Sequence, residues 1–110
     1  MSNKIEVNNP LGVSVVCSRK QWYKHVITEH PVMRGNEKAV EETIETPDSI
    51  HTSTIDNRHV YFKNGATSTY NSSLVTKVVT ETDEENNETV VTAFPTKKAA
   101  GGIKDEIYHK

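Results

Sequence analysis

Two histidines, His25 and His30, lie five residues apart in the stretch QWYKHVITEHPVM, residues 21–33. Imidazole has a pKa near neutrality, so either side chain can accept or donate a proton at physiological pH. Histidine is also common near helix ends, where it donates to unpaired backbone carbonyls and moves no proton. The residues around the pair decide between these two roles.

The neighbouring residues favour different roles for the two histidines. Ser18 is a good N-cap for a helix that begins one residue later, and Pro31 disfavours the helical conformation at the residue before it. On a helical wheel, His30 falls in the apolar arc and at the helix C-terminus, which favours packing or capping. His25 falls at the border of that arc, one turn from Glu29, where proton transfer stays open as a role.

Composition excludes several classes of protein. The chain has 110 residues, a formal net charge of −2 and one cysteine, Cys17. This charge counts against a high-affinity, non-specific nucleic-acid binder, although it leaves room for a local basic strip. A single cysteine can form neither an internal disulfide nor a cysteine-based zinc site. The two helix histidines lie about 140° apart on the helical wheel, too far apart to bind one metal ion together. We therefore expect no metal and no cofactor. The opening residues MSNKIEVNNP lack the apolar stretch of a signal peptide, and the printed sequence has no long apolar run, so we expect a cytoplasmic protein without membrane contact.

Hydrophobic spacing predicts one α+β domain, residues 1–110, with its core at about 18–96. Two short β-like runs open the chain, at 3–8 and 11–17, and helices follow at 19–30 and from Asn36 to the TPD signal. Four later runs alternate with a period of two and are separated by hairpin-like turns: 50–54, 58–63, 74–81 and 89–94. We therefore expect two N-terminal helices packed on one face of an antiparallel sheet of about four strands, with short β segments at the N-terminus.

Alternation along these runs assigns side chains to the two faces of the sheet. Arg58 and Tyr61 are expected on opposite faces, and Thr92 is expected on the same face as Val90 and Phe94. Arg58 opens its run, where an arginine is either a solvated edge charge or a phosphate ligand, because guanidinium binds phosphate oxygens in a bidentate manner.

Five short motifs occur in order along residues 20–96: W..HV...HP, V..TI.TPD.I, R.VYF, LVTKVV and VVTAF. Their order and spacing together resemble the phage-borne and toxin-type domains of the barnase–EndoU–colicin–RelE-like nuclease group. Members of that group carry a W..HI...HP helix, a helix ending in nPd.I, an R.yY strand and a final vvTay strand. The likeness covers roughly two thirds of the chain.

The resemblance implies a helix-then-sheet fold and metal-independent RNA cleavage, in which the ribose 2′-hydroxyl attacks the adjacent phosphate and leaves a 2′,3′-cyclic phosphate. Such a reaction needs a proton acceptor, a proton donor and a cation on the developing phosphorane charge. Matched by position, the catalytic candidates are His25, Arg58 and Thr92. The candidates for substrate binding are His30, Tyr61 and Lys97.

Phe94 stands where the nuclease group has its closing tyrosine, and this leaves a second interpretation open. The chain would then be a catalytically inactive relative that binds protein or nucleic acid through the same fold. Its net charge of −2 and the acidic turn within residues 81–88 agree with that interpretation. An active phage- or toxin-associated domain instead predicts RNA as the substrate and an immunity or antitoxin protein as the partner.

Overall fold

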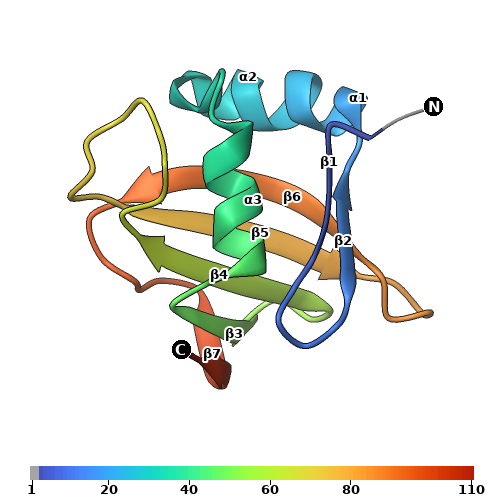
Figure 1. The fold of residues 1–110 in the computed structure, drawn as a ribbon. Helices are drawn as coiled ribbons and strands as arrows, with labels where there is room; N and C mark the ends of the chain where they lie inside the picture. Colours follow the sequence, from blue (N-terminus) through green and yellow to red (C-terminus); the bar gives the residue numbers. More distant parts are fainter. Residues whose placement is uncertain (1–2) are drawn as a thin grey trace.

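A seven-stranded sheet forms the centre of the computed structural model, which describes residues 3–110 (Figure 1). The strands are β1 (Ile5–Asn8), β2 (Ser14–Cys17), β3 (Ser49–Ser53), β4 (Arg58–Asn64), β5 (Val75–Thr82), β6 (Glu88–Thr96) and β7 (Ile103–His109). Their spatial order is β1-β2-β6-β5-β4-β3-β7. Neighbouring strands are antiparallel except β2 and β6, which run parallel, so the sheet is mixed.

The helical segments lie on one side of this sheet (Figure 1). They are α1 (Arg19–Gln21), the π-helical turn η1 (Trp22–Val26), α2 (Ile27–Glu29), the 3₁₀ turn η2 (Pro31–Met33) and α3 (Glu37–Glu45). The Ser18 hydroxyl accepts from the backbone N–H of Gln21 at 3.0 Å, so the predicted N-cap is present. His30 leaves the helical conformation, with φ −134° and ψ 79°, directly before Pro31. Within residues 3–110, no helix is long and apolar enough to cross a membrane.

The predicted fold class is wrong in the extent of the sheet and in the amount of helix. Within residues 3–110, seven strands form a mixed sheet in place of about four antiparallel ones, and the helical segments are short. The β1–β2 hairpin joins β6 through Val15, which lies opposite Glu88. The tail forms β7 beside β3, although most of its side chains are exposed. The β-like runs predicted at 3–8 and 11–17 contain β1 and β2, but their sequences do not indicate that they extend the sheet. The exposed strand β7 buries few apolar side chains, so its sequence does not indicate a strand.

The main core lies between the helices and the sheet. Trp22, Val26 and Met33 are fully buried there, and α3 adds Val40 and Ile44. These side chains pack against residues from four strands: Ile50, Tyr61, Val78 and Ala93. Burying one side chain of this size contributes about 1.5–3 kcal/mol. The helices are therefore fixed on one face, and the other face of the sheet is helix-free.

The helix-free face carries a second, smaller core. It consists of Val60, Phe62 and Val75, with Val79 and Ile103 packed against them. Residues 97–102 connect β6 to β7 and pass over this face. The Lys77 Nζ donates to the Gly101 carbonyl at 3.1 Å, and the Thr54 N–H donates to the Gly102 carbonyl at 2.9 Å. Gly101 has a φ of +91°, a conformation that favours glycine. This crossing segment therefore covers part of the helix-free face.

A β-bulge in β6 changes which face Thr92 occupies. The register between β5 and β6 shifts after Val79: Thr92 lies opposite Val79, whereas Val90 lies opposite Thr80. The extra residue, Val91, turns the rest of the strand over. Val90 is therefore buried in the main core, and Thr92 lies on the helix-free face. The prediction that Thr92 and Val90 share a face is wrong, because alternation in the sequence gives no sign of the inserted residue.

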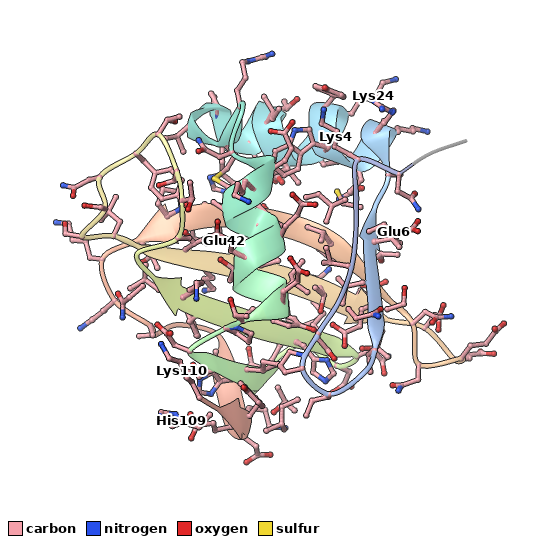
Figure 2. All side chains as sticks on the ribbon, viewed as in Figure 1. Lys4, Glu6, Lys24, Glu42, His109 and Lys110 are labelled. Atoms are coloured by element: carbon pink, nitrogen blue, oxygen red, sulfur yellow. The ribbon has the colours of Figure 1, made fainter. Side chains whose placement is uncertain are left out.

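The outer surface of the helical side carries charges of both signs, as Lys4, Lys24 and Glu42 illustrate in Figure 2. Lys4 Nζ lies 3.0 Å from Glu37 Oε2. Glu42 Oε1 accepts from the Thr67 N–H at 3.0 Å, and this hydrogen bond lowers the pKa of Glu42. These contacts tie α3 to β1 and to the loop before β5, so the acidic side chains of α3 are partly structural.

Candidate functional site

Arg58 and Thr92 line one cavity on the helix-free face, with a volume of about 170 Å³. We call it the Arg58–Thr92 cavity; Lys77, Gly101 and Gly102 also contribute to its wall. Arg58 Nε and Thr92 Oγ1 are both buried, and neither makes a hydrogen bond with any residue within 3–110. A buried polar group without a partner costs about 1–3 kcal/mol. Thr92 Oγ1 has no partner and Arg58 Nε has only a long contact with a carboxylate, so the wall that they share suits a ligand that accepts hydrogen bonds.

The charge of Arg58 is balanced by a neighbouring carboxylate. Glu81 lies directly opposite Arg58 in the β4–β5 register, and its Oε2 is 3.5 Å from Arg58 Nε. The Glu81 side chain is 55% exposed. Ion pairs of this kind contribute about 0–1 kcal/mol, because water screens them. An anionic ligand can therefore compete with Glu81 for the guanidinium at little cost.

A larger cavity of about 570 Å³ also has Arg58 in its wall. We call it the Gln21 cavity; its wall consists of Asn3, Val16, Cys17, Ser18, Gln21, Arg58, Glu81, Thr89, Val90 and Val91. Gln21 Nε2 donates to the Val91 carbonyl at 2.7 Å, which joins the first helical segment to the bulge in β6. Arg58 lines both cavities, so the two are adjacent at this residue.

His25 lies outside both cavities. Its side chain is exposed on the π-helical turn η1 and makes no hydrogen bond or ion pair with another residue in the described part of the chain. Gln21, which does line a cavity, precedes His25 by about one helical turn. π-helical turns are frequent at functional sites. Of the three catalytic candidates, the structure brings Arg58 and Thr92 together in one cavity and leaves His25 outside it.

His30 contacts the helix-free face through Phe94. The two rings stack with centroids 4.5 Å apart and planes inclined by 25°. Lys77 Nζ lies over the Phe94 ring at 5.4 Å and over Phe62 at 5.9 Å, and burial lowers the pKa of Lys77. His30 therefore packs, as the sequence predicts, and its partner Phe94 also contacts Lys77, which lines the Arg58–Thr92 cavity.

The other two predicted substrate ligands lie elsewhere. Tyr61 is fully buried on the helical side of the sheet, the face opposite Arg58. Lys97 is exposed directly after β6, at the start of the crossing segment. The structure therefore does not bring either of them to the cavity that holds Arg58 and Thr92.

Tyr61 belongs to a buried polar network centred on Glu88, which the sequence does not reveal. Glu88 is 1% exposed and accepts from Tyr61 Oη at 2.7 Å, Thr80 Oγ1 at 2.6 Å and His59 Nδ1 at 3.1 Å. Asn9 Nδ2 donates to Tyr61 Oη at 3.0 Å. Burial raises the pKa of Glu88, but the three hydrogen bonds outweigh it and hold that pKa below its ordinary value. The hydrogen bond to Glu88 raises the pKa of His59.

This network joins β4, β5, β6 and the loop after β1, so we interpret it as structural. Because Glu88 follows directly after an acidic turn, the sequence alone predicts that its side chain is exposed to solvent. The available signal is spacing: His59 and Tyr61 alternate on β4, and Thr80 lies opposite His59 in the hairpin register. Glu81 at the candidate site follows from the same register, whereas Gln21 carries no sequence signal, because its contact depends on the bulge at Val91.

Comparisons with known proteins do not extend this description. No model of a known family, no curated protein and no solved structure matches the chain significantly. Within residues 3–110, no group of three or more His, Cys, Asp or Glu side chains is arranged to hold a metal ion. The likeness to the nuclease group therefore rests on the ordered motifs alone, and the function is inferred from the cavities.

Proposed function

We propose that this domain binds a phosphodiester of RNA at Arg58 and Thr92 and cleaves it without a metal ion. One observation carries the proposal: Arg58 and Thr92 line the same cavity, and each has a buried donor, Nε and Oγ1, that makes no hydrogen bond within residues 3–110. The non-bridging oxygens of a phosphodiester accept hydrogen bonds and carry the negative charge that a guanidinium favours. The ordered likeness to the nuclease group supports RNA as the source of that phosphodiester.

The proposed reaction uses the ribose 2′-hydroxyl as its nucleophile. Its oxygen attacks the adjacent phosphorus while a base removes the proton, and the 5′-oxygen of the next nucleotide leaves with a proton from an acid. The products are a 2′,3′-cyclic phosphate and a free 5′-hydroxyl. Arg58 stabilises the additional charge on the phosphorane, and Thr92 donates to a phosphate oxygen.

We assign the two proton transfers to Glu81 and His25. Glu81 lies beside Arg58, lines the Gln21 cavity and is half exposed, so a substrate can reach its carboxylate. His25 is carried over from the nuclease resemblance, and its side chain is exposed, so a substrate can reach the imidazole ring. Positioned acids and bases of this kind accelerate a reaction by about 10²–10⁴-fold each.

The same proposal specifies where the protein acts and with what partner. RNA is the proposed substrate, and the cytoplasm is the proposed compartment. A domain with one free, buried thiol, Cys17, fits this compartment, because disulfides are rare there. A ribonuclease of the phage or toxin type must be held inactive until needed, so we expect an immunity or antitoxin protein that covers the helix-free face.

A second candidate function is RNA binding without cleavage at the same site. Phe94 favours it, because this side chain has no hydroxyl and its ring is stacked against His30. The pairing of Arg58 with Glu81 favours it as well, since a guanidinium that stays paired with a carboxylate stabilises less of the additional charge that cleavage puts on the phosphorane.

The test is an RNA-cleavage assay in EDTA that compares wild type with Arg58→Ala, Thr92→Val and His25→Ala. Arg34→Ala is the matched control, because Arg34 is exposed and lines neither cavity. We expect cyclic-phosphate ends, with cleavage reduced about 10²–10³-fold in Arg58→Ala and unchanged in Arg34→Ala. Binding without cleavage by folded wild type would select the binding function. If folded wild type neither binds nor cleaves any RNA, the proposal is wrong.

A further inference from the structure

The Gln21 cavity has the size and the wall of a small-molecule subsite. Its volume of about 570 Å³ lies within the range of about 300–1,000 Å³ typical of ligand pockets. Val16, Val90 and Cys17 give it apolar surface, and burial raises the pKa of the Cys17 thiol to about 12, which keeps this wall neutral. Gln21 and Glu81 add polar groups. An aromatic ring with polar edges fits such a wall.

The side-chain amide of Gln21 is held in one orientation. Val91 is the bulge residue and has no partner in the β5–β6 register, so its carbonyl is available to the helix. Gln21 Nε2 donates to this carbonyl at 2.7 Å, and the Gln21 backbone N–H donates to Ser18 Oγ at 3.0 Å. A carbonyl only accepts, so the amide nitrogen must face Val91 and Oε1 must face away from it. Gln21 therefore offers a fixed acceptor.

Glu81 adds a second acceptor to the same cavity. Its carboxylate is half exposed and lies next to the guanidinium of Arg58, where the proposed function places the phosphate. Two acceptors select a ligand that donates. Adenine, cytosine and guanine each carry an exocyclic amino group that donates hydrogen bonds, whereas the edge of uracil presents two carbonyl acceptors and one N–H.

We infer that the Gln21 cavity binds the nucleobase next to the phosphate held by Arg58, and that Gln21 favours bases with an exocyclic amino group over uracil. This inference rests on the proposed function, because Arg58 fixes the phosphate from which the base is reached. It adds a specificity residue outside the motifs that resemble the nuclease group.

Binding of uncleavable 2′-O-methyl trinucleotides tests the inference. The probes differ only in the central unit, which is A, C, G, U or an abasic sugar, and their Kd values are measured by calorimetry. We expect the three amino bases to bind wild type about tenfold more tightly than U, the value of one net hydrogen bond. In Gln21→Leu this difference should disappear while the abasic probe binds unchanged. Asn64→Leu is the control, since Asn64 lines neither cavity.

A second measurement avoids any substitution. Gln21 is the single glutamine of the chain, so ¹⁵N-glutamine labelling gives one pair of side-chain amide resonances. We expect these resonances to shift with the amino-base probes and not with the abasic probe. Equal affinity for all four bases, or a preference that persists in Gln21→Leu, would overturn the inference and leave the proposed function standing. Failure of folded wild type to bind any probe, the abasic one included, would contradict the proposed function itself.

Discussion

Replacing Glu88 by glutamine removes one negative charge from the buried network that joins β4, β5 and β6. Glu88 accepts three hydrogen bonds, from His59, Tyr61 and Thr80. A hydrogen bond to a charged group contributes about 1.5–3 kcal/mol and a neutral one about 0.5–1.5 kcal/mol. Three bonds together lose about 3 kcal/mol, and part of this returns because no charge is buried any longer. We expect Glu88→Gln to lower the free energy of unfolding by about 1–2 kcal/mol at mildly acidic pH.

This loss depends on pH in a defined direction. The pKa of Glu88 is lowered from 4.5, so its contribution is present above pH 4.5 and is lost as pH falls through the lowered value. The pKa of His59 is raised from 6.5, so its contribution is present below pH 6.5 and is lost as pH rises through the raised value. Both contributions are complete only between pH 4.5 and pH 6.5. The free energy of unfolding of wild type should therefore exceed that of Glu88→Gln most near pH 5.5.

Urea unfolding followed by circular dichroism at pH 5.5 and pH 9 measures this difference. Glu85→Gln is the matched control, because Glu85 is exposed in the turn before β6 and its side chain makes no hydrogen bond within residues 3–110. We expect the control to match wild type at both pH values. A Glu88→Gln variant as stable as wild type at pH 5.5, or equally destabilised at both pH values, would refute the assignment of an ion pair to this network.

Three further substitutions have defined outcomes. Thr92→Val removes a buried hydroxyl that lacks a partner, so thermal stability should stay constant or rise by up to about 1 kcal/mol, while calorimetry should show about tenfold weaker RNA binding. Ser18→Ala removes the N-cap that accepts from Gln21 and should cost about 1 kcal/mol in urea unfolding. Tyr61→Phe removes the donor to Glu88 and should cost about 1.5–3 kcal/mol in the same assay, because the bond is to a charged group. A loss of stability in Thr92→Val, or no loss in the other two variants, would contradict the contacts described.

Local signals in the sequence predict individual elements better than they predict the sheet. Ser18 and Pro31 bound the first helical segment, because capping and the missing N–H of proline act within a few residues. The predicted runs of period two lie in β3 to β6. The parallel contact of Val15 with Glu88 depends on chain segments more than 70 residues apart, and no local pattern encodes it. The exposed strand β7 shows no apolar alternation.

At the candidate site, too, the sequence indicates some residues, whereas others depend on contacts between distant segments of the chain. The order of the motifs predicts Arg58 and Thr92 as site residues, and both line one cavity of the fold. Glu81 could have been predicted from the hairpin register, because it lies opposite Arg58. The position of Gln21 depends on one inserted residue, Val91, and a bulge leaves no mark on the alternation of its strand.

The most direct test of the central claim is the side-chain resonance of Arg58 during a titration with RNA. Arg19, Arg34 and Arg58 are the arginines of the chain, so ¹⁵N-arginine labelling gives a simple Nε–H spectrum. On addition of an uncleavable 2′-O-methyl dinucleotide, we expect the Arg58 Nε–H resonance to shift as a phosphate oxygen becomes its hydrogen-bond acceptor, and the Arg34 resonance to stay in place. An Arg58 resonance that does not move at saturating dinucleotide would contradict phosphodiester binding at this site.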